Sequence, residues 1–365
     1  MSTSSQHTRQ HNKRQPPQHG GNLDDAIRRY GIEREQWLDL SSGVSPWAWP
    51  IPSLPQHVWT NLPSSTDELL KSATRYLSCD DQSIVASPGS QLLIRLIPQQ
   101  LKSSNVAIPA LGYQEHQHSW QLAGHTIHYY QSFDELHSLI DSKQVEHALV
   151  INPNNPTGET ILADEVSHLA QKTPGLLIVD EAFMDLYQFD GTQGEQTIQS
   201  AIKRPHDNQI VLRSVGKFFG LAGLRVGFAV GTHPIINKLT SILEPWSLNH
   251  ASQYLATQML KDTVWQQAQT IKIKNESQHF ENIIRGFAQI VLTDFHLSNG
   301  GLFITLFANK EALKQTHITL AQHSILTRLH NPNDHHAWLR FSLTQQPMKC
   351  QSIFEQIIND KHQKR

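Results

Sequence analysis

Five side chains that could do chemistry lie beside short apolar runs typical of buried strands. They are the amide of Asn155, the carboxylate of Asp180, the hydroxyl of Ser214, the amine of Lys217 and the guanidinium of Arg225. An amine can condense with an aldehyde, a carboxylate can hold a proton on a ring nitrogen, and a guanidinium can bind a phosphate through two hydrogen bonds. Taken alone, each residue is more often a turn, cap or surface residue. Their order and spacing beside strand ends favour one common site.

The elements that must position these residues begin near residue 84, where short apolar runs alternate with amphipathic segments of helix length. This pattern predicts βαβ units and an α/β fold with a mostly parallel central sheet. The predicted strands span 105–108, 147–151, 176–179, 210–213 and 226–230. The predicted helices span 91–97 and 163–171, and another follows Pro234. Because ligands bind at the carboxyl ends of strands in such a sheet, the site residues are expected to meet there.

The sequence also predicts a division into domains. The expected parts are a flexible tail at 1–18, an N-terminal segment of a small domain at 19–79, a large domain at 80–245 and the rest of the small α+β domain at 246–365. In the N-terminal segment we expect a helix that stops at Gly31, then a proline-rich stretch from 41 to 63 without regular helix.

The C-terminal segment begins with the pattern of a long helix, whose expected apolar positions include Ile271, Phe280 and Phe287. The strands expected after it are 302–307, 324–329 and 337–343.

Composition argues against several classes of protein. The 365 residues include 30 Lys and Arg against 32 Asp and Glu, a net charge of −2, which lacks the cation surplus of a general nucleic-acid binder. There is no run of 18 apolar residues and no apolar signal-peptide core. We therefore expect a cytoplasmic protein with neither a membrane nor a nucleic-acid partner. Cys79 and Cys350 are far apart and outside any C-x-x-C spacing, so neither a disulfide nor a metal site is predicted.

Three runs of sequence carry a family resemblance. NPNNPTG, VDEAF and SVGKFFGLAGLRVG, in this order and spacing, resemble the signature of fold-type I pyridoxal-phosphate enzymes of the aminotransferase class I/II superfamily. The resemblance extends from Gly20 to about Ile358. Within it, HGGN at 19–22, PGSQ at 88–91 and GKFFG at 216–220 are more similar to the threonine-phosphate decarboxylases of the cobalamin pathway than to histidinol-phosphate aminotransferases. The resemblance implies a homodimer with active sites at the subunit interface.

The resemblance assigns cofactor contacts residue by residue. It implies that Lys217 condenses with the aldehyde of pyridoxal 5′-phosphate and that Asp180 pairs with the pyridine nitrogen. Asn155 would donate a hydrogen bond to the phenolic oxygen, and the ring of Tyr113 would stack on the cofactor.

The phosphate and the substrate are assigned in the same way. The residues expected around the cofactor phosphate are Gly89, Ser90, Gln91, Ser214 and Arg225, the first three at the start of a helix. Those expected to bind the anionic groups of a small phosphorylated amino-acid substrate are His19, Arg328 and Arg340.

Three residues depart from the family pattern. Phe183 replaces a tyrosine that bonds to the cofactor oxygen, and Gly216 replaces a frequent serine that contacts the phosphate. Leu62 lies near the place of a tyrosine that reaches the phosphate of the partner subunit's site.

The leading functional prediction is decarboxylation of O-phospho-L-threonine to (R)-1-amino-2-propanol O-phosphate in cobalamin biosynthesis. The alternative is a histidinol-phosphate aminotransferase or a related class I/II aminotransferase. A non-enzymatic binding or regulatory domain ranks last, because no basic helix-turn-helix segment precedes Gly20. A nucleotide P-loop is not supported, since Phe218 follows Lys217 where that motif has Ser or Thr.

Overall fold

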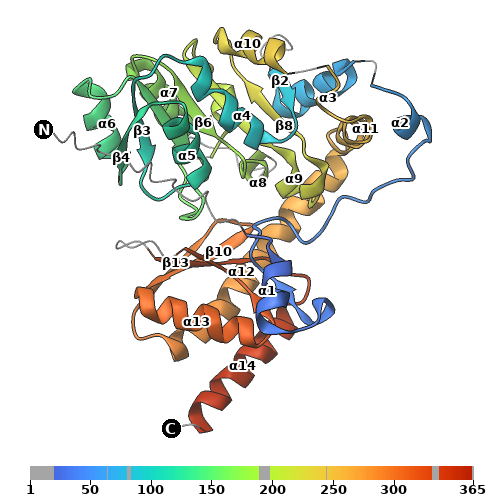
Figure 1. Cartoon of the computed structure of the whole chain (residues 1–365), viewed down its shortest axis with the longest axis vertical. Coiled ribbons are helices and arrows are strands. Elements are labelled where there is room, and N and C mark those ends of the chain that lie inside the picture. Colours follow the sequence, from blue (N-terminus) through green and yellow to red (C-terminus); the bar gives the residue numbers. More distant parts are fainter. Residues whose placement is uncertain are drawn as a thin grey trace, which may run out of the picture.

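The computed structural model describes residues 20–63, 65–79, 84–188, 198–243, 245–330 and 337–363. Two sheets, one above the other in Figure 1, organise this part of the chain. The larger has seven strands in the order β2-β8-β7-β6-β5-β3-β4. Its strands are β2 (Ile84–Ser87), β3 (Asn105–Pro109), β4 (Thr126–Tyr130), β5 (His147–Ile151), β6 (Leu177–Asp180), β7 (Gln209–Ser214) and β8 (Gly227–Val230).

The prediction of a mostly parallel sheet is confirmed. Strands β4, β3, β5, β6 and β7 run parallel to one another, and β8 is antiparallel to both of its neighbours. The five predicted strands correspond to β3, β5, β6, β7 and β8, with ends that differ by one residue at most. The edge strands β2 and β4 were not predicted. Most of β4 is not fully buried, so its sequence lacks a continuous apolar run.

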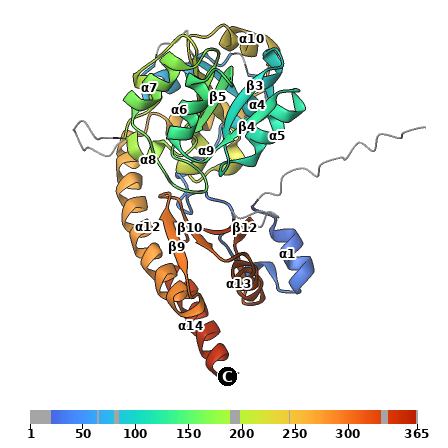
Figure 2. The same ribbon diagram turned by 90° about the vertical axis from the view of Figure 1, so that its left-hand side faces the viewer.

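Each central strand is buried on both faces, because alternate residues belong to two apolar clusters. Leu149 of β5 and Ile178 of β6 pack in one cluster, while Val150 and Val179 pack in the other. Helices α4, α5 and α10 contribute to the first cluster, and α3, α6 and α7 contribute to the second. Figure 2 shows α6 and α7 on one side of the strands and α4 and α5 on the other.

The helices of this part include the two predicted at 91–97 and 163–171, which correspond to α4 and α7. Their bounds are α3 (Asp67–Leu77), α4 (Ser90–Leu96), α5 (Gln114–Leu122), α6 (Phe133–Asp141), α7 (Ala163–Lys172), α8 (Asp185–Gln188), α9 (Val215–Phe218), α10 (Ile235–Ile242) and α11 (His250–Met259).

The smaller sheet is antiparallel and has the order β12-β13-β10-β9. Its strands are β9 (Phe295–Asn299), β10 (Phe303–Ala308), β12 (Arg328–His330) and β13 (Trp338–Ser342). The long helix α12 (Thr263–Val291) joins the two parts of the molecule, and α13 (Lys310–Gln322) and α14 (Pro347–Gln363) complete the lower part (Figures 1 and 2). The long helix was predicted, but Ile271 is exposed, and its buried side passes through Ile273 instead.

The N-terminal segment lies with the C-terminal part of the chain. A short parallel pair joins β1 (Leu38–Asp39) to β11 (Ile325–Leu326), so the predicted strand 324–329 is divided between β11 and β12. This pairing agrees with the expectation that the N-terminal segment is part of the small domain. The boundaries of that domain stay a prediction. Helix α1 (Leu23–Tyr30) stops at Gly31, which has a left-handed φ of 65°.

One prediction about this segment is wrong. The stretch 41–63 contains a single helical turn, α2 (His57–Thr60). The turn fits because no proline interrupts the chain between Pro55 and Pro63, and the carbonyl of Pro55 accepts a bond from the Val58 N–H.

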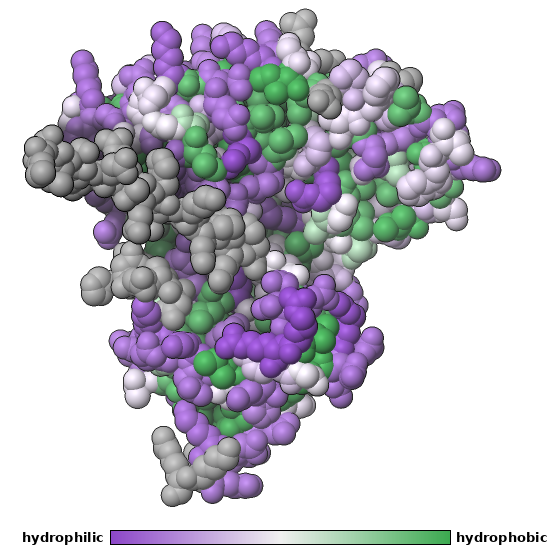
Figure 3. Space-filling model, viewed as in Figure 1, coloured by the Kyte–Doolittle hydropathy of each residue, from purple (hydrophilic) through white to green (hydrophobic). Residues whose placement is uncertain are grey.

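Hydrophilic side chains cover much of the face seen in Figure 3, with small apolar patches between them. No helix in the described ranges is both long and apolar enough to cross a membrane.

Candidate active site

The carboxyl ends of β6 and β7 open into a cavity of about 350 Å³. The starts of α4 and α5 and the chain from α9 to Val226 supply other walls. The lining residues are Val44, Ser90, Gln91, Ile94, Tyr113, Glu115, Asp180, Ser214, Gly216, Lys217, Ala222, Arg225 and Val226. The structure therefore brings seven of the predicted site residues to one place, namely Ser90, Gln91, Tyr113, Asp180, Ser214, Lys217 and Arg225.

Asp180 is buried at the last position of β6 and is held by hydrogen bonds. Its Oδ2 lies 2.7 Å from His116 Nε2, and its Oδ1 accepts a bond of 3.0 Å from the Ala182 N–H. Burial alone would raise the pKa of Asp180, but the hydrogen bond and charge of His116, together with Lys217, hold that pKa below its usual value. The carboxylate is thus kept ionised and can pair with a protonated nitrogen in the cavity.

Lys217 lies in α9, directly after β7, and its amine points at an aromatic face. Its Nζ is 4.6 Å from the centroid of the Phe183 ring. Burial lowers the pKa of Lys217; Asp180 opposes this effect, while Arg340 and Arg225 add to it. A lowered pKa leaves more of the amine unprotonated at neutral pH, which favours attack on an aldehyde.

Two glycines allow Arg225 and the start of α4 to approach each other. Gly89 has a φ of 79°, and a Cβ there would lie 2.7 Å from Nη2 of Arg225. A Cβ on Gly227 would collide with the backbone nitrogen of Ser90. The close packing gathers the guanidinium and the hydroxyls of Ser90 and Ser214 around the cavity, a donor set suited to a phosphate.

Tyr113 is fixed by a chain of hydrogen bonds along the cavity wall. Its hydroxyl donates to Gln91 Oε1 at 2.8 Å, and Gln91 Nε2 donates to Glu115 Oε2 at 2.8 Å. Burial raises the pKa of Tyr113 to about 12, with Glu115 adding to the effect, so the hydroxyl stays protonated as the donor. Both polar atoms of the Gln91 side chain take part in these hydrogen bonds. The backbone N–H of Gln91 is therefore the group that it can offer to a phosphate.

Arg340 and Arg328 come from neighbouring strands of the smaller sheet. They are direct partners in the antiparallel pairing of β12 and β13, so their side chains leave the same face. Arg340 is only 1% exposed; its Nη1 donates to Asn155 Oδ1 at 2.7 Å and its Nη2 donates to the Ser41 carbonyl at 3.0 Å. Arg340 has no carboxylate partner within the described ranges, and its Nε is buried without a hydrogen bond. A buried cation of this kind is suited to an anionic ligand.

The structure treats three other singled-out residues differently. His19 is outside the described residues. Leu62 is exposed and does not line the cavity. Gly216 does line it, and a Cβ there would lie 3.0 Å from the Leu221 carbonyl oxygen, so a serine would be crowded at this position. Local packing therefore explains that departure from the family pattern.

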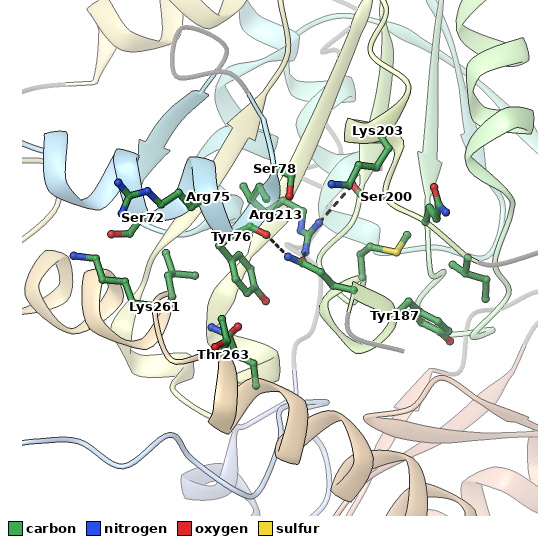
Figure 4. A pocket seen from close by; sticks show the side chains of 17 residues that line it. Ser72, Arg75, Tyr76, Ser78, Tyr187, Ser200, Lys203, Arg213, Lys261 and Thr263 are labelled. Atoms are coloured by element: carbon green, nitrogen blue, oxygen red, sulfur yellow. Dashed lines mark hydrogen bonds between the residues drawn. The ribbon is translucent and has the colours of Figure 1, made fainter. Parts of the chain in front are cut away.

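A larger cavity, of about 640 Å³, lies beside α3, α8 and the start of α12 (Figure 4). Its buried cation is Arg213, whose neighbour Ser214 lines the first cavity. Arg213 is neutralised by Glu181 and Asp185, and Asp185 also accepts a 2.7 Å bond from the Tyr76 hydroxyl. No predicted site residue lines this cavity, and its fully buried arginine is already paired, so we place the chemistry in the smaller one.

Sequence reasoning missed His116, Glu115 and Phe303. His116 contacts Asp180 across 64 positions of sequence, a separation at which no spacing rule links two residues. Glu115 lines the cavity and accepts the hydrogen bond from Gln91 Nε2. Phe303 lies on β10, and its ring is 5.2 Å from the Arg340 guanidinium. For all three, the only available signal is their closeness in the folded chain.

The residues of the cavity fit pyridoxal phosphate in both chemistry and shape. An amine, an ionised carboxylate, a guanidinium and two hydroxyls line one space, and Gly89 leaves room that a Cβ would take from the guanidinium. Arg340 lies next to Asn155, and its Nε is buried and makes no hydrogen bond within the described residues. This N–H is therefore a donor that a ligand could use.

A family model described as aminotransferase class I and II matches residues 54–357. The chain belongs to this family. It is 37% identical to a threonine-phosphate decarboxylase of Pseudomonas aeruginosa over 271 residues, which cover 73% of this chain and 78% of the relative. It is 29% identical to a histidinol-phosphate aminotransferase of Thermoanaerobacter pseudethanolicus over 276 residues, or 73% and 74% of the two chains.

A solved structure of histidinol-phosphate aminotransferase from Sinorhizobium meliloti, in complex with pyridoxal-5′-phosphate, shares the fold. It aligns with a TM-score of 0.78 at 17% identity and covers 98% of this chain and 99% of its own. The family membership confirms the predicted pyridoxal-phosphate-dependent enzyme, and the aligned structure confirms the predicted fold.

Proposed function

We propose that this enzyme decarboxylates O-phospho-L-threonine to (R)-1-amino-2-propanol O-phosphate, an intermediate of cobalamin biosynthesis. The observation that carries the proposal is the pair of arginines on β12 and β13. Burial lowers the pKa of both Arg340 and Arg328, and Tyr113 of the cavity wall is close enough to oppose the shift in each. Two desolvated guanidinium groups on one face of the smaller sheet suit a substrate that carries both a carboxylate and a phosphate.

The cavity residues then have distinct tasks. When bound, pyridoxal phosphate accepts the electron pair that remains on the substrate α-carbon. Asp180 would hold the proton on the pyridine nitrogen, and His116 keeps that carboxylate ionised and oriented. Asn155, whose Oδ1 accepts from Arg340, has its Nδ2 amide as the group that would donate to the phenolic oxygen. Ser90, Ser214 and Arg225 would bind the cofactor phosphate.

The arginines decide which bond breaks. The groups that hold the substituents of the α-carbon select which of its bonds breaks. By holding the substrate phosphate and carboxylate, Arg340 and Arg328 would favour loss of carbon dioxide over loss of a proton. Lys217 would then supply the proton that replaces the carboxylate.

The names of the similar proteins support the same substrate class. The P. aeruginosa relative is a threonine-phosphate decarboxylase, and the T. pseudethanolicus relative is a histidinol-phosphate aminotransferase. Phosphothreonine and histidinol phosphate, the substrates in these two names, both carry a phosphate. The second name makes amino transfer with histidinol phosphate the alternative function, and the higher identity favours the first.

Two parallel incubations of the purified holoenzyme test the proposal. The first contains phosphothreonine alone, and the second contains histidinol phosphate with 2-oxoglutarate; carbon dioxide and glutamate are measured in both. We expect carbon dioxide from the first and little glutamate in the second, with no product from Lys217→Ala. Arg328→Ala should raise KM for phosphothreonine about 10²-fold, since a charge-assisted contact is lost. Arg204→Ala, at an exposed arginine paired with Asp164, is the matched control. Glutamate without carbon dioxide would establish the alternative.

A further inference from the structure

Two aromatic rings lie between the Lys217 amine and the Arg340 guanidinium. Lys217 Nζ is 4.6 Å from the centroid of Phe183, and the Arg340 guanidinium carbon is 5.2 Å from the centroid of Phe303. The two rings meet edge to face, with centroids 5.1 Å apart and planes at 78°. An edge-to-face contact is a favoured arrangement of aromatic pairs. The four side chains therefore form one continuous row of contacts from the amine to the guanidinium.

Packing around the rings fixes them independently of the cations. Phe303 is fully buried on β10, and a Cβ on Gly300 would collide with its ring. Phe183 is buried in the turn between β6 and α8. Because Phe183 is buried and packs edge to face on the fixed ring of Phe303, its own ring face is a preformed surface against which the amine of Lys217 can rest.

The Lys217 amine lies over the ring face of Phe183. Within the described part of the chain, no oxygen accepts a hydrogen bond from its Nζ. The charged groups that act on it are Asp180 and Asp185, which favour the ammonium form, and Arg340 and Arg225, which disfavour it. An aromatic face attracts a cation more strongly where water is excluded.

We propose that Phe183 is a positioning residue that holds the free ammonium form of Lys217 against its ring, directed at the substrate carbon that carbon dioxide has left. The step itself rests on the proposed function. The bond between the α-carbon and the carboxylate breaks and its electron pair stays on that carbon. A new carbon–hydrogen bond forms with a proton from Lys217 Nζ, and the amine regains a proton from water. An uncharged amine would act as a base, which amino transfer needs and decarboxylation does not.

The contact is tested first in the protein without cofactor, where no reaction is involved. Competitive acetylation across a range of pH, followed by peptide mass spectrometry, gives the pKa of the Lys217 amine. A cation–π contact of about 0.5–2 kcal/mol corresponds to a shift of about 0.4–1.5 in pKa. Phe183→Leu should lower the pKa of Lys217 by this amount. Phe183→Tyr, which keeps the ring face, should retain the wild-type value.

Phe280→Leu is the matched control, because it removes a buried ring from α12. It should leave the pKa of Lys217 unchanged. Phe183→Met also removes the ring face while conserving volume, and it serves if the leucine variant does not fold. An unchanged pKa in a folded Phe183 variant, or an equal fall in Phe280→Leu, would overturn the proposal.

The second readout is the fate of phosphothreonine in the holoenzyme. We measure the number of turnovers that end in amino transfer to the cofactor and divide it by the amount of carbon dioxide released. This ratio should rise about two- to thirtyfold in Phe183→Leu and should not change in Phe280→Leu. An unchanged ratio would overturn the proton-donor role even if the labelling shift is found. Absence of carbon dioxide from the wild type would instead overturn the proposed function, while the labelling result would still decide the contact.

Discussion

Asp180 is the residue on which the electron-accepting role of the cofactor depends. Asp180→Asn removes the negative charge that holds a proton on the pyridine nitrogen, so we expect kcat to fall about 10²-fold or more. Asp134→Asn, at an exposed position of α6, should leave kcat unchanged. Steady-state assays of both variants at saturating cofactor measure the difference. Similar kcat values for the two would contradict the assignment.

At the residue scale, the sequence predicted which groups meet but not how they are held. Asn155, Asp180, Ser214 and Lys217 could be found because each follows a strand, and parallel strands bring these ends together. Arg225 precedes β8, whose antiparallel direction places its start at the same edge of the sheet. Their supporting contacts depend on tertiary packing, and spacing carries no signal for it. From the sequence, Asp185→Asn would be expected to have little effect; in the structure the carboxylate is buried between Tyr76 and Arg213, so this substitution would leave a buried arginine poorly paired.

At the scale of elements, the entry of α4 beside Arg225 depends on Gly89. Gly89→Ala would place a Cβ 2.7 Å from the guanidinium and on a backbone with φ of 79°, so Arg225 must move away from the phosphate end of the cavity. We expect the affinity for pyridoxal phosphate to fall about tenfold or more. Gly223→Ala is the control, because a Cβ there meets nothing within 4 Å. Fluorescence titration of the cofactor-free proteins measures both; equal affinities would contradict this account of the cradle.

The start of β5 makes a different prediction, about pH. His147 is buried, and its Nδ1 accepts a 2.8 Å bond from the Leu176 N–H. Burial lowers its pKa from 6.5 to about 4, with His125 and His233 adding to the effect. As the pH falls through this window, the unfolded chain takes up a proton that the folded chain does not. The free energy of unfolding should therefore fall as the pH drops from 6.5 to about 4, and this group should cause no further fall below that pH.

Urea unfolding at several pH values measures this dependence. His147→Gln should make the free energy of unfolding less dependent on pH in that window, whereas His279→Gln, at an exposed position of α12, should not. The same slope in His147→Gln and the wild type would show that His147 is not responsible.

Elements differ in how far the sequence specified them. The central strands were predicted within a residue because both of their faces are buried, which leaves a clear apolar run. The edge strand β4 and the turn α2 were missed because partial exposure and flanking prolines hide them. The division of the segment 324–329 between β11 and β12 reflects pairing with the distant β1, which no local pattern records.

At the scale of the whole molecule, we expect a homodimer. Trp59, Leu62 and Trp246 are 68%, 66% and 59% exposed, and contact between the rings of His57 and His250 brings α2 beside the start of α11. Large apolar side chains gathered on one surface mark an interface. Analytical ultracentrifugation should give about 83 kDa, twice the chain mass of 41.4 kDa. Trp246→Glu should shift the protein toward monomer, while Val264→Glu, at another exposed apolar position, should not. A monomeric wild type would contradict this expectation.

The central claim is that the site breaks the bond to the carboxylate and returns a proton to the same carbon. The most direct measurement uses phosphothreonine labelled with ¹³C in its carboxylate, turned over by the wild-type holoenzyme in D₂O without any keto acid and followed by NMR. We expect one labelled carbon dioxide per amine formed, with one deuterium on the carbon that carried the carboxylate. Label retained in a keto acid, with the amino group left on the cofactor, would contradict it.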